Sequence, residues 1–183
     1  MLTEVMILSF GGQGGVTAAR ILALAAVNEG MFAQAIPQFG AERRGSLVRS
    51  YLRLSDQPIR RHSSIKKADV LAIFAEKILK IVEVREFLRD GGITVLNAKH
   101  GIAEKSYCVD AAGIALSLNL VAAGWPIVNT AMAGAMAKPL EISIESVINA
   151  INSTFSGELA RINARAAEIA YREVKKCQAG SST

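Results

Sequence analysis

The chain has 183 residues, of which 51% are hydrophobic and 20% charged, a balance typical of a compact globular protein. This length is enough for one full hydrophobic core but short for two. No apolar run approaches the roughly 20 residues that a membrane span requires, and the apolar N-terminus lacks the basic start of a secretion signal. We therefore expect a cytoplasmic protein with no membrane partner.

The positive charge is concentrated in one segment. The net charge is +5 at pH 7, and the isoelectric point is about 9.4. Between positions 43 and 67 there are many arginines and lysines but only one acid, Asp56. A locally basic surface favours a phosphate-bearing ligand, an acidic protein or a nucleic acid. Nucleic acid is disfavoured as a partner, because Tyr51 is the one aromatic residue of this segment and no recognition motif is present.

Strands and helices are predicted to alternate along the chain. Residues 4–10 form a buried strand that leads through the turn GGQGG into an amphipathic helix ending at Gly30. Further strands are expected at 31–36, 46–54, 69–74, 92–98 and 107–110, and helices at 78–88, 111–119, 129–138, 142–151 and 158–176. This alternation predicts a three-layer, Rossmann-like α/β fold with a mostly parallel sheet and helices on both faces. We expect a single domain over 1–176 and a flexible C-terminal tail over 177–183.

The strand at 46–54 carries two different faces. Period-two alternation places on its more polar face Leu47, Arg49, Tyr51 and Arg53. A strand of this kind is expected to expose one face, so it should lie near a sheet edge or at an interface.

The turn after the first strand is the first candidate binding site. It consists of Gly11, Gly12, Gln13, Gly14 and Gly15. Glycine permits positive φ and close approach of a ligand, and the helix N-terminus that follows offers unpaired N–H groups to an anion. The dinucleotide pattern G-x-G-x-x-G is not met, because from Gly12 its third glycine position falls on Thr17. A phosphate-binding turn and a purely structural turn both stay open.

The loop after the second strand is the other candidate site. It contains Phe39, Gly40, Glu42, Arg43, Arg44 and Gly45, and Arg49 follows in the next strand. Its two glycines indicate a defined loop shape, and arginine suits two-pronged recognition of a carboxylate or a phosphate. A solvated charged loop is the alternative interpretation.

No residue of this chain is expected to be catalytic or to bind a metal. His62 and His100 stand alone, without the spacing of a triad or a metal site. Cys108 and Cys177 are far apart, whereas an iron–sulfur cluster or a structural zinc needs about four ligands. We expect the two cysteines to be ordinary free thiols, because disulfides are rare in reducing compartments.

The segment GWPIVNTAMAGAMAK is expected to be structural. Trp125 precedes a helix-entry turn and should pack in the core. Asn129 and Thr130 fit the N-terminus of the helix that follows, where side-chain oxygens cap free N–H groups.

Several segments together resemble the gamma subunit, or gamma domain, of 2-oxoacid:ferredoxin oxidoreductases. They are GGQGGVTAARILALAA, FAQAIPQFGAERRGSLVRSYLRLSDQPI, KKADVLAIF, PIVNTAMAGAMAK and ISIESVINAI, in order from about residue 5 to 151. The most specific part is FGAERRG with its following strand and SDQPI. This loop resembles the pyruvate and branched-chain members more than the 2-oxoglutarate type.

The resemblance implies a non-catalytic subunit of an enzyme complex of anaerobic metabolism. Such a complex converts a 2-oxoacid and coenzyme A to acyl-CoA and carbon dioxide and passes electrons to ferredoxin. Thiamine diphosphate and iron–sulfur clusters would be held by alpha, beta and ferredoxin-like delta partners, so this chain alone would bind no cofactor. Coenzyme A phosphates, if they touch this chain, are expected near Gly11–Gly15 and Thr17 or near Arg43, Arg44 and Arg49.

Two further expectations complete the interpretation of the sequence. The alternative function is a freestanding NADP- or nucleotide-binding α/β oxidoreductase, in which Arg43 or Arg44 would meet the NADP phosphate. For the isolated chain, a symmetric homodimer is the default expectation.

Overall fold

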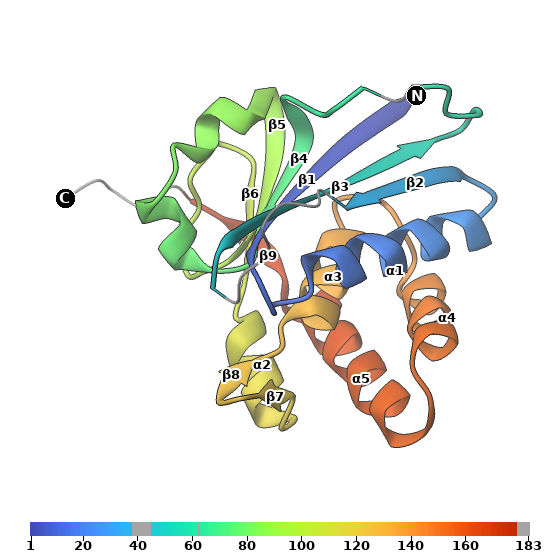
Figure 1. Cartoon of the computed structure of the whole chain (residues 1–183), viewed down its shortest axis with the longest axis vertical. Coiled ribbons are helices and arrows are strands. Elements are labelled where there is room, and N and C mark those ends of the chain that lie inside the picture. Colours follow the sequence, from blue (N-terminus) through green and yellow to red (C-terminus); the bar gives the residue numbers. More distant parts are fainter. Residues whose placement is uncertain (38–44, 62, 179–183) are drawn as a thin grey trace.

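A computed structural model describes residues 1–37, 45–61 and 63–178, and within them one seven-stranded sheet forms the centre of the molecule (Figure 1). The strand order across the sheet is β2-β3-β1-β4-β5-β6-β9. These strands are β1 (Leu2–Phe10), β2 (Phe32–Pro37), β3 (Leu47–Ser55), β4 (Ala68–Ile73), β5 (Leu88–Asn97), β6 (Ser106–Val109) and β9 (Lys175–Cys177). A separate two-stranded hairpin pairs β7 (Val121–Ala122) with β8 (Trp125–Pro126).

Most strands of the sheet point in the same direction. The neighbours β1, β4, β5 and β6 pair in parallel, whereas β3 is antiparallel to both β1 and β2 and β9 is antiparallel to β6. Only β3 and β9 therefore run against the others, and the predicted mostly parallel sheet is confirmed. Strand β1 lies between β3 and β4, which explains its unbroken apolar run from Val5 to Leu8, buried on both faces.

The α-helices of the described residues cover one face of the sheet (Figure 1). They are α1 (Gly15–Asn28), α2 (Ala111–Ser117), α3 (Asn129–Ala137), α4 (Ile144–Thr154) and α5 (Gly157–Glu173). Between them and the sheet lies the larger hydrophobic core, which we call the helix-side core; it includes Val5, Ile7, Leu22 and Met132. None of these helices combines the length and the apolar composition that crossing a bilayer demands.

Short 3₁₀ helices and loops cover the opposite face. Two 3₁₀ helices, η1 (Glu76–Lys80) and η2 (Val84–Phe87), pack on a smaller core, the loop-side core, that includes Met6, Leu8, Leu71 and Ile78. The single helix predicted over 78–88 is therefore wrong in type and extent. Its β-branched residues lower the stability of an α-helix, and the Glu83 side chain accepts a hydrogen bond from the backbone N–H of Arg85, which starts a second turn. The three-layer α/β class is nevertheless confirmed, with 3₁₀ helices as the third layer.

Strand β3 is more enclosed than its alternating sequence suggests. It lies between β2 and β1 rather than at the edge, and its polar face contributes Leu47 and Tyr51 to the loop-side core. Arg53 has no exposed surface. The predicted exposed face is therefore wrong for Tyr51 and Arg53: Tyr51 packs in the loop-side core, and Arg53 donates to the carbonyls of Arg61 and Ser63.

The C-terminal part of the chain is tied to the far edge of the sheet. Helix α5 ends at Glu173 rather than continuing to 176, and β9 follows it. A disulfide joins Cys108 in β6 to Cys177 in β9, with Cα atoms 5.8 Å apart, so the expectation of free thiols is wrong. Cys177 and Gln178, placed by the sequence in a flexible tail, are thus held against the sheet; the remaining positions of that tail lie outside the described residues.

Candidate functional site

The glycine turn joins the carboxyl end of β1 to α1. Gly12 and Gly14 adopt positive φ angles of 94° and 80°. Gln13 locks the turn to the strand, because its backbone N–H donates to the Phe10 carbonyl at 3.0 Å and its side-chain Oε1 accepts from the Phe10 N–H at 2.8 Å. Gln13 therefore has a structural role that its spacing alone did not reveal.

Two glycines of the turn are required by close packing. A Cβ atom on Gly14 would lie 2.7 Å from Nδ2 of Asn129, the first residue of α3. A Cβ atom on Gly15 would lie 2.6 Å from the Ser9 hydroxyl of β1. These contacts let α1 start close to both the sheet and α3, so the structural interpretation accounts for Gly14 and Gly15.

The same turn presents unpaired backbone donors. Within the described chain, hydrogen-bond partners are lacking for the N–H groups of Gly12, Gly14, Gly15, Val16 and Thr17. The last three open a 14-residue helix that has no acidic residue in its first turn and no side-chain cap. A helix N-terminus of this kind carries a partial positive charge and favours an anion. The geometry is therefore compatible with the anion site expected from the sequence, without identifying a ligand.

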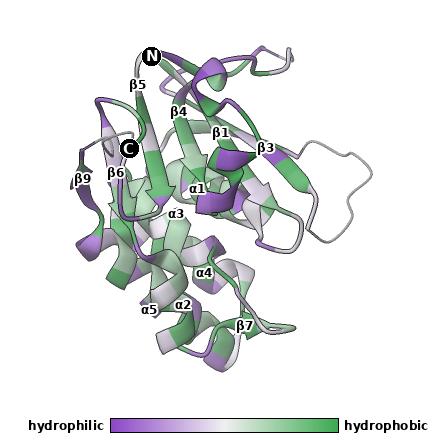
Figure 2. Cartoon of the chain, turned by 90° about the vertical axis from the view of Figure 1, so that its left-hand side faces the viewer, coloured by the Kyte–Doolittle hydropathy of each residue, from purple (hydrophilic) through white to green (hydrophobic). Residues whose placement is uncertain are grey.

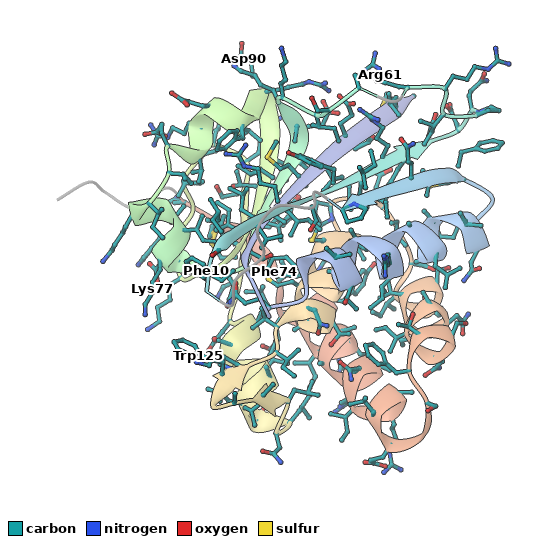
Figure 3. The ribbon with its side chains drawn as sticks, viewed as in Figure 1. Phe10, Arg61, Phe74, Lys77, Asp90 and Trp125 are labelled. Carbon is teal, nitrogen blue, oxygen red and sulfur yellow. A yellow bond between two sulfur atoms is a disulfide. The ribbon has the colours of Figure 1, made fainter. Side chains whose placement is uncertain are left out.

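The position of the turn in the sheet is one where α/β proteins commonly bind ligands. The chain leaves β1 through α1 toward β2 and β3 on one side, and β4 lies on the other side of β1. Ligand sites form outside the carboxyl ends of parallel strands at such a change of direction. Figure 3 shows Phe10, Phe74, Lys77 and Trp125 gathered at this end of the molecule.

Trp125 is an exposed residue of this region that the sequence interpretation placed wrongly. It is 69% exposed, not packed in the core, because the β7–β8 hairpin turns at Ala123 and Gly124, both with positive φ, and projects from the body. The Lys77 ammonium lies 5.9 Å from the centroid of its indole ring. Its sequence context, a tryptophan between glycine and proline, indicates an exposed turn rather than a position in the core.

The second candidate loop meets the glycine turn at its end. The Gly11 N–H donates to the Ser46 carbonyl at 2.8 Å, and the Gly45 N–H donates to the Gly11 carbonyl at 3.4 Å. Phe39, Gly40, Glu42, Arg43 and Arg44 lie outside the described residues. Arg49 is on the loop-side face of β3, where its guanidinium stacks 4.5 Å from the ring centroid of Phe87.

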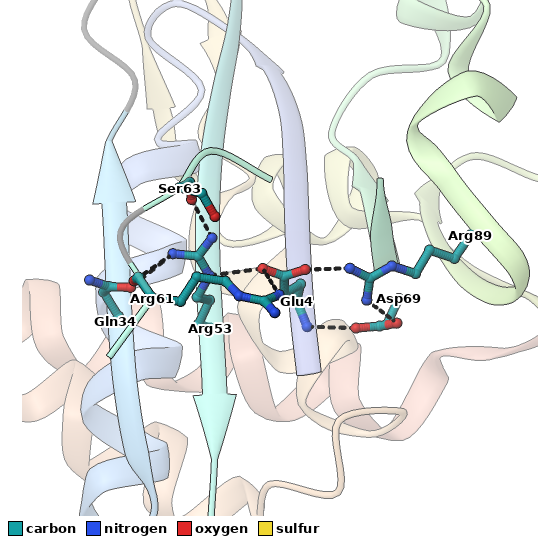
Figure 4. Close-up of polar contacts among 7 residues, drawn as sticks. All are labelled: Glu4, Gln34, Arg53, Arg61, Ser63, Asp69 and Arg89. Carbon is teal, nitrogen blue, oxygen red and sulfur yellow. Dashed lines mark hydrogen bonds and ion pairs between the residues drawn. The ribbon is translucent and has the colours of Figure 1, made fainter. Parts of the chain in front are cut away.

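A buried polar cluster, absent from the sequence interpretation, lies at the other end of β1 (Figure 4). Glu4 is 3% exposed and Arg53 is fully buried. Arg53 Nε donates to the Glu4 carboxylate at 2.9 Å, and three further N–H groups reach Gln34 Oε1 and the carbonyls of Arg61 and Ser63. Because four of the five N–H donors of this buried guanidinium are used within the protein, we interpret the cluster as structural.

The charge of Glu4 is stabilised by its partners. Burial raises the pKa of Glu4, but hydrogen bonds from Arg53 and Arg89 outweigh that effect and hold its pKa below the ordinary value. Arg89 also pairs with Asp69 at 2.7 Å. Glu4 and Arg53 are direct partners in the antiparallel β1–β3 register, so opposite charges at paired strand positions were the signal for this contact.

The other residues singled out by the sequence have structural or surface positions. The Asn129 Oδ1 accepts from the Thr130 N–H at 2.8 Å, and the Thr130 hydroxyl donates to Asn163 of α5 at 2.9 Å. Both residues are buried and structural, but the predicted capping role is wrong, because the N-cap residue of α3 is Val128 and no side chain caps the helix. His100 is exposed, and His62 lies outside the described residues. In the part of the chain that the structure describes, no three or more histidine, cysteine or acidic side chains gather as a metal site would require.

A shallow groove of about 570 Å³ between α4 and α5 is a weaker candidate for an anion site. It contains Arg161 and Arg165, each of which pairs with an acid of the same helix. Its cations are therefore already neutralised, and the glycine turn is the better candidate.

Comparison with known proteins identifies the chain's relatives. Residues 4–173 match the family described as pyruvate ferredoxin/flavodoxin oxidoreductase. Pyruvate synthase subunit PorC of Methanothermobacter thermautotrophicus is 43% identical over 170 residues, covering 91% of this chain and 92% of the relative. The pyruvate/ketoisovalerate oxidoreductases common subunit gamma of Thermococcus kodakarensis is 44% identical, covering 89% and 92%.

The fold has a close match among solved structures. The crystal structure of pyruvate oxidoreductase subunit PORC from Thermotoga maritima superposes with a TM-score of 0.78 at 29% identity, over 95% of this chain and 97% of that one. These matches lend no support to the alternative of a freestanding nucleotide-binding oxidoreductase. The chain belongs to the pyruvate ferredoxin/flavodoxin oxidoreductase family.

Proposed function

We propose that this chain is the gamma subunit of a pyruvate or branched-chain 2-oxoacid:ferredoxin oxidoreductase. The observation that carries the proposal is the near end-to-end match to relatives named as subunits of such enzymes, with about nine-tenths of both chains covered. The chain completes an assembly with alpha, beta and ferredoxin-like delta subunits in the cytoplasm and contributes no catalytic residue. The partners hold thiamine diphosphate and iron–sulfur clusters, and coenzyme A is the co-substrate.

This proposal is tested by purifying the chain with its companions. An affinity tag at Met1, which is 90% exposed, avoids the disulfide-linked C-terminal strand. Anaerobic purification from native cells should recover larger subunits with iron and thiamine diphosphate, identified by mass spectrometry and metal analysis. The 2-oxoacid that drives ferredoxin reduction then names the substrate. Recovery of the chain alone, colourless and binding a dinucleotide, would contradict the proposal.

A second part of the proposal assigns coenzyme A phosphates to the glycine turn. The unpaired N–H groups of Gly12 and of Gly14–Thr17 support it, as does the backbone link between Gly11 and the end of the arginine loop. Gly45, which bonds to Gly11, directly follows Arg43 and Arg44 in the sequence, and arginine suits phosphate recognition. The arrangement gives the subunit a part in closing over coenzyme A.

The contact is tested in the assembled complex. The double variant Arg43→Ala/Arg44→Ala should raise the Michaelis constant for coenzyme A by roughly tenfold, because two charge-assisted contacts are lost, and leave that for the 2-oxoacid unchanged. The matched control is Lys66→Ala/Lys67→Ala, which removes the same charge from exposed positions of the same basic segment. An assembled arginine variant with an unchanged constant for coenzyme A would refute this contact.

A further inference from the structure

Strand β9 has few noncovalent ties to the sheet. It is three residues long and pairs with β6 alone, with Cys177 opposite Ser106, Lys176 opposite Tyr107 and Lys175 opposite Cys108. Lys175 and Lys176 are both exposed, and Figure 2 shows hydrophilic colour on this strand at the edge of the molecule. Apolar burial, which holds most edge strands, therefore contributes little here.

Hydrogen bonds hold the chain just before and just after β9, but they do not replace the missing apolar burial of the strand. The Gly101 N–H donates to the Gln178 carbonyl at 2.9 Å. On the other side, the Lys138 ammonium donates to the carbonyls of Tyr171 and Val174 at 3.3 and 3.5 Å, which holds the end of α5. The chain is thus anchored up to Val174, and beyond β9 the described residue Gln178 is held by the backbone hydrogen bond from Gly101.

The disulfide is the strongest tie of the C-terminal strand. Cys108 is 4% exposed and belongs to the loop-side core, whereas Cys177 is only partly buried and packs at the rim of that core. We propose that Cys108 and Cys177 are a redox-active pair that latches β9 to β6, and that its reductant is a dithiol, either a small molecule or a dithiol protein. While the pair is linked, the outer edge of β6 is closed; once it is reduced, β9 separates from that edge.

The exposure of the two cysteine residues sets the order of the reaction. A thiolate of the reductant attacks the sulfur of Cys177, the less buried residue, and the Cys108 sulfur leaves as a thiolate and takes up a proton. The second thiol of the reductant then displaces Cys177 from the mixed disulfide and becomes the reductant's own disulfide. The pair gains two electrons and two protons, all supplied by the dithiol.

Opening the latch changes the edge of the sheet. Without β9, strand β6 becomes an edge strand whose outer N–H and C=O groups have no strand partner among the residues that the structure describes. Such an edge can pair with a strand of another protein. The redox state of the cysteine pair therefore decides whether the chain's own C-terminal segment or another strand occupies this edge.

The experiment uses the full-length chain in the complex with which it purifies. Samples with and without dithiothreitol are alkylated for thiol counting and compared by amide hydrogen exchange over residues 106–108 and 175–178. Without dithiothreitol we expect a Cys108–Cys177 linked peptide. With dithiothreitol both cysteines should alkylate, and exchange in both segments should rise by about tenfold or more. Removing the reductant and adding an oxidised dithiol should restore slow exchange.

Two variants separate the latch from a general loss of structure. Cys177→Ser should show fast exchange at 175–178 with or without dithiothreitol, with β1 and α5 unchanged. Lys176→Ala keeps both cysteines and should respond to dithiothreitol like the original chain. Complete alkylation of both cysteines before any reductant is added would overturn the proposal, and so would exchange at 175–178 that does not change when the pair is reduced.

Discussion

At the scale of single residues, loss of the buried Arg53 side chain should destabilise the protein strongly. It is fully buried, and its removal leaves the Glu4 carboxylate buried with fewer partners. Arg53→Ala should lower the free energy of unfolding by about 3–5 kcal/mol, since breaking a buried ion pair leaves an uncompensated charge. Denaturant unfolding followed by circular dichroism measures this loss.

Arg61 provides the control for this prediction. Its side chain is 53% exposed and its guanidinium lies 3.5 Å from the same carboxylate. Arg61→Ala should therefore cost no more than about 1 kcal/mol. Equal losses for the two variants would show that burial does not govern the strength of this cluster.

The same cluster predicts a loss of stability in acid. Hydrogen bonds from Arg53 and Arg89 overcome the effect of burial and hold the pKa of Glu4 below its ordinary value of 4.5. A depressed carboxyl pKa contributes stability that is present above the unfolded-state pKa and is lost as pH falls through the folded-state pKa. Unfolding free energies measured from pH 7 down to 3 should therefore fall below about pH 4.5.

Glu4→Gln isolates this contribution. The variant should be less stable at pH 7, yet the decline of its unfolding free energy below pH 4.5 should be shallower. Glu104→Gln, a change at an exposed acid, should keep the original slope. An unchanged slope in Glu4→Gln would assign the acid sensitivity to other carboxylates.

At the scale of elements, helices α3 and α5 pack closely against each other. A Cβ atom on Gly134 of α3 would lie 2.1 Å from the Ala167 carbonyl of α5. Every residue of α3 is buried, because α3 lies between α1, α5 and the sheet. After Asn129 and Thr130 the helix contains only alanine, methionine and glycine, so it has no polar face.

Gly134→Ala should therefore push helices α3 and α5 apart. We expect a loss of about 3 kcal/mol in the free energy of unfolding, because the added methyl group meets backbone atoms that cannot rotate away. Thermal unfolding by calorimetry measures the change. Asn152→Ala, on the exposed side of α4, should stay within about 0.5 kcal/mol of the original chain. A stable Gly134→Ala chain would mean that α3 and α5 can move apart at little cost.

At the scale of the whole molecule, the disulfide links parts of the chain 69 positions apart. Such a link restricts the unfolded chain, so its reduction should lower the global free energy of unfolding by about 2–4 kcal/mol. Denaturant unfolding with and without dithiothreitol tests this. The double variant Cys108→Ser/Cys177→Ser should unfold at the reduced chain's midpoint, whether or not dithiothreitol is present. If dithiothreitol still shifted the unfolding midpoint of that variant, the reductant would be acting on something other than the cysteine pair.

Most helices and strands could be predicted from local sequence patterns. The apolar run at 4–10, the glycine turn and the amphipathic stripe of α5 each depend on neighbouring residues, and each lies within a few positions of its expected bounds. The segment 78–88 was assigned wrongly because its apolar spacing fits a helix, whereas its β-branched residues and the Glu83 side chain favour two separate turns. Hydrophobic periodicity alone does not reveal that these local residues oppose an α-helix.

What the sequence by itself determined is therefore the α/β class, the order of most elements, the glycine turn at the end of the first strand and the family resemblance. Only the tertiary structure decided that Glu4 meets Arg53, that Cys108 meets Cys177 and that Trp125 stands exposed. The physical reason is that helices and turns follow from nearby residues. Contacts between distant positions instead depend on strand order and register, which are set by the packing of the whole chain.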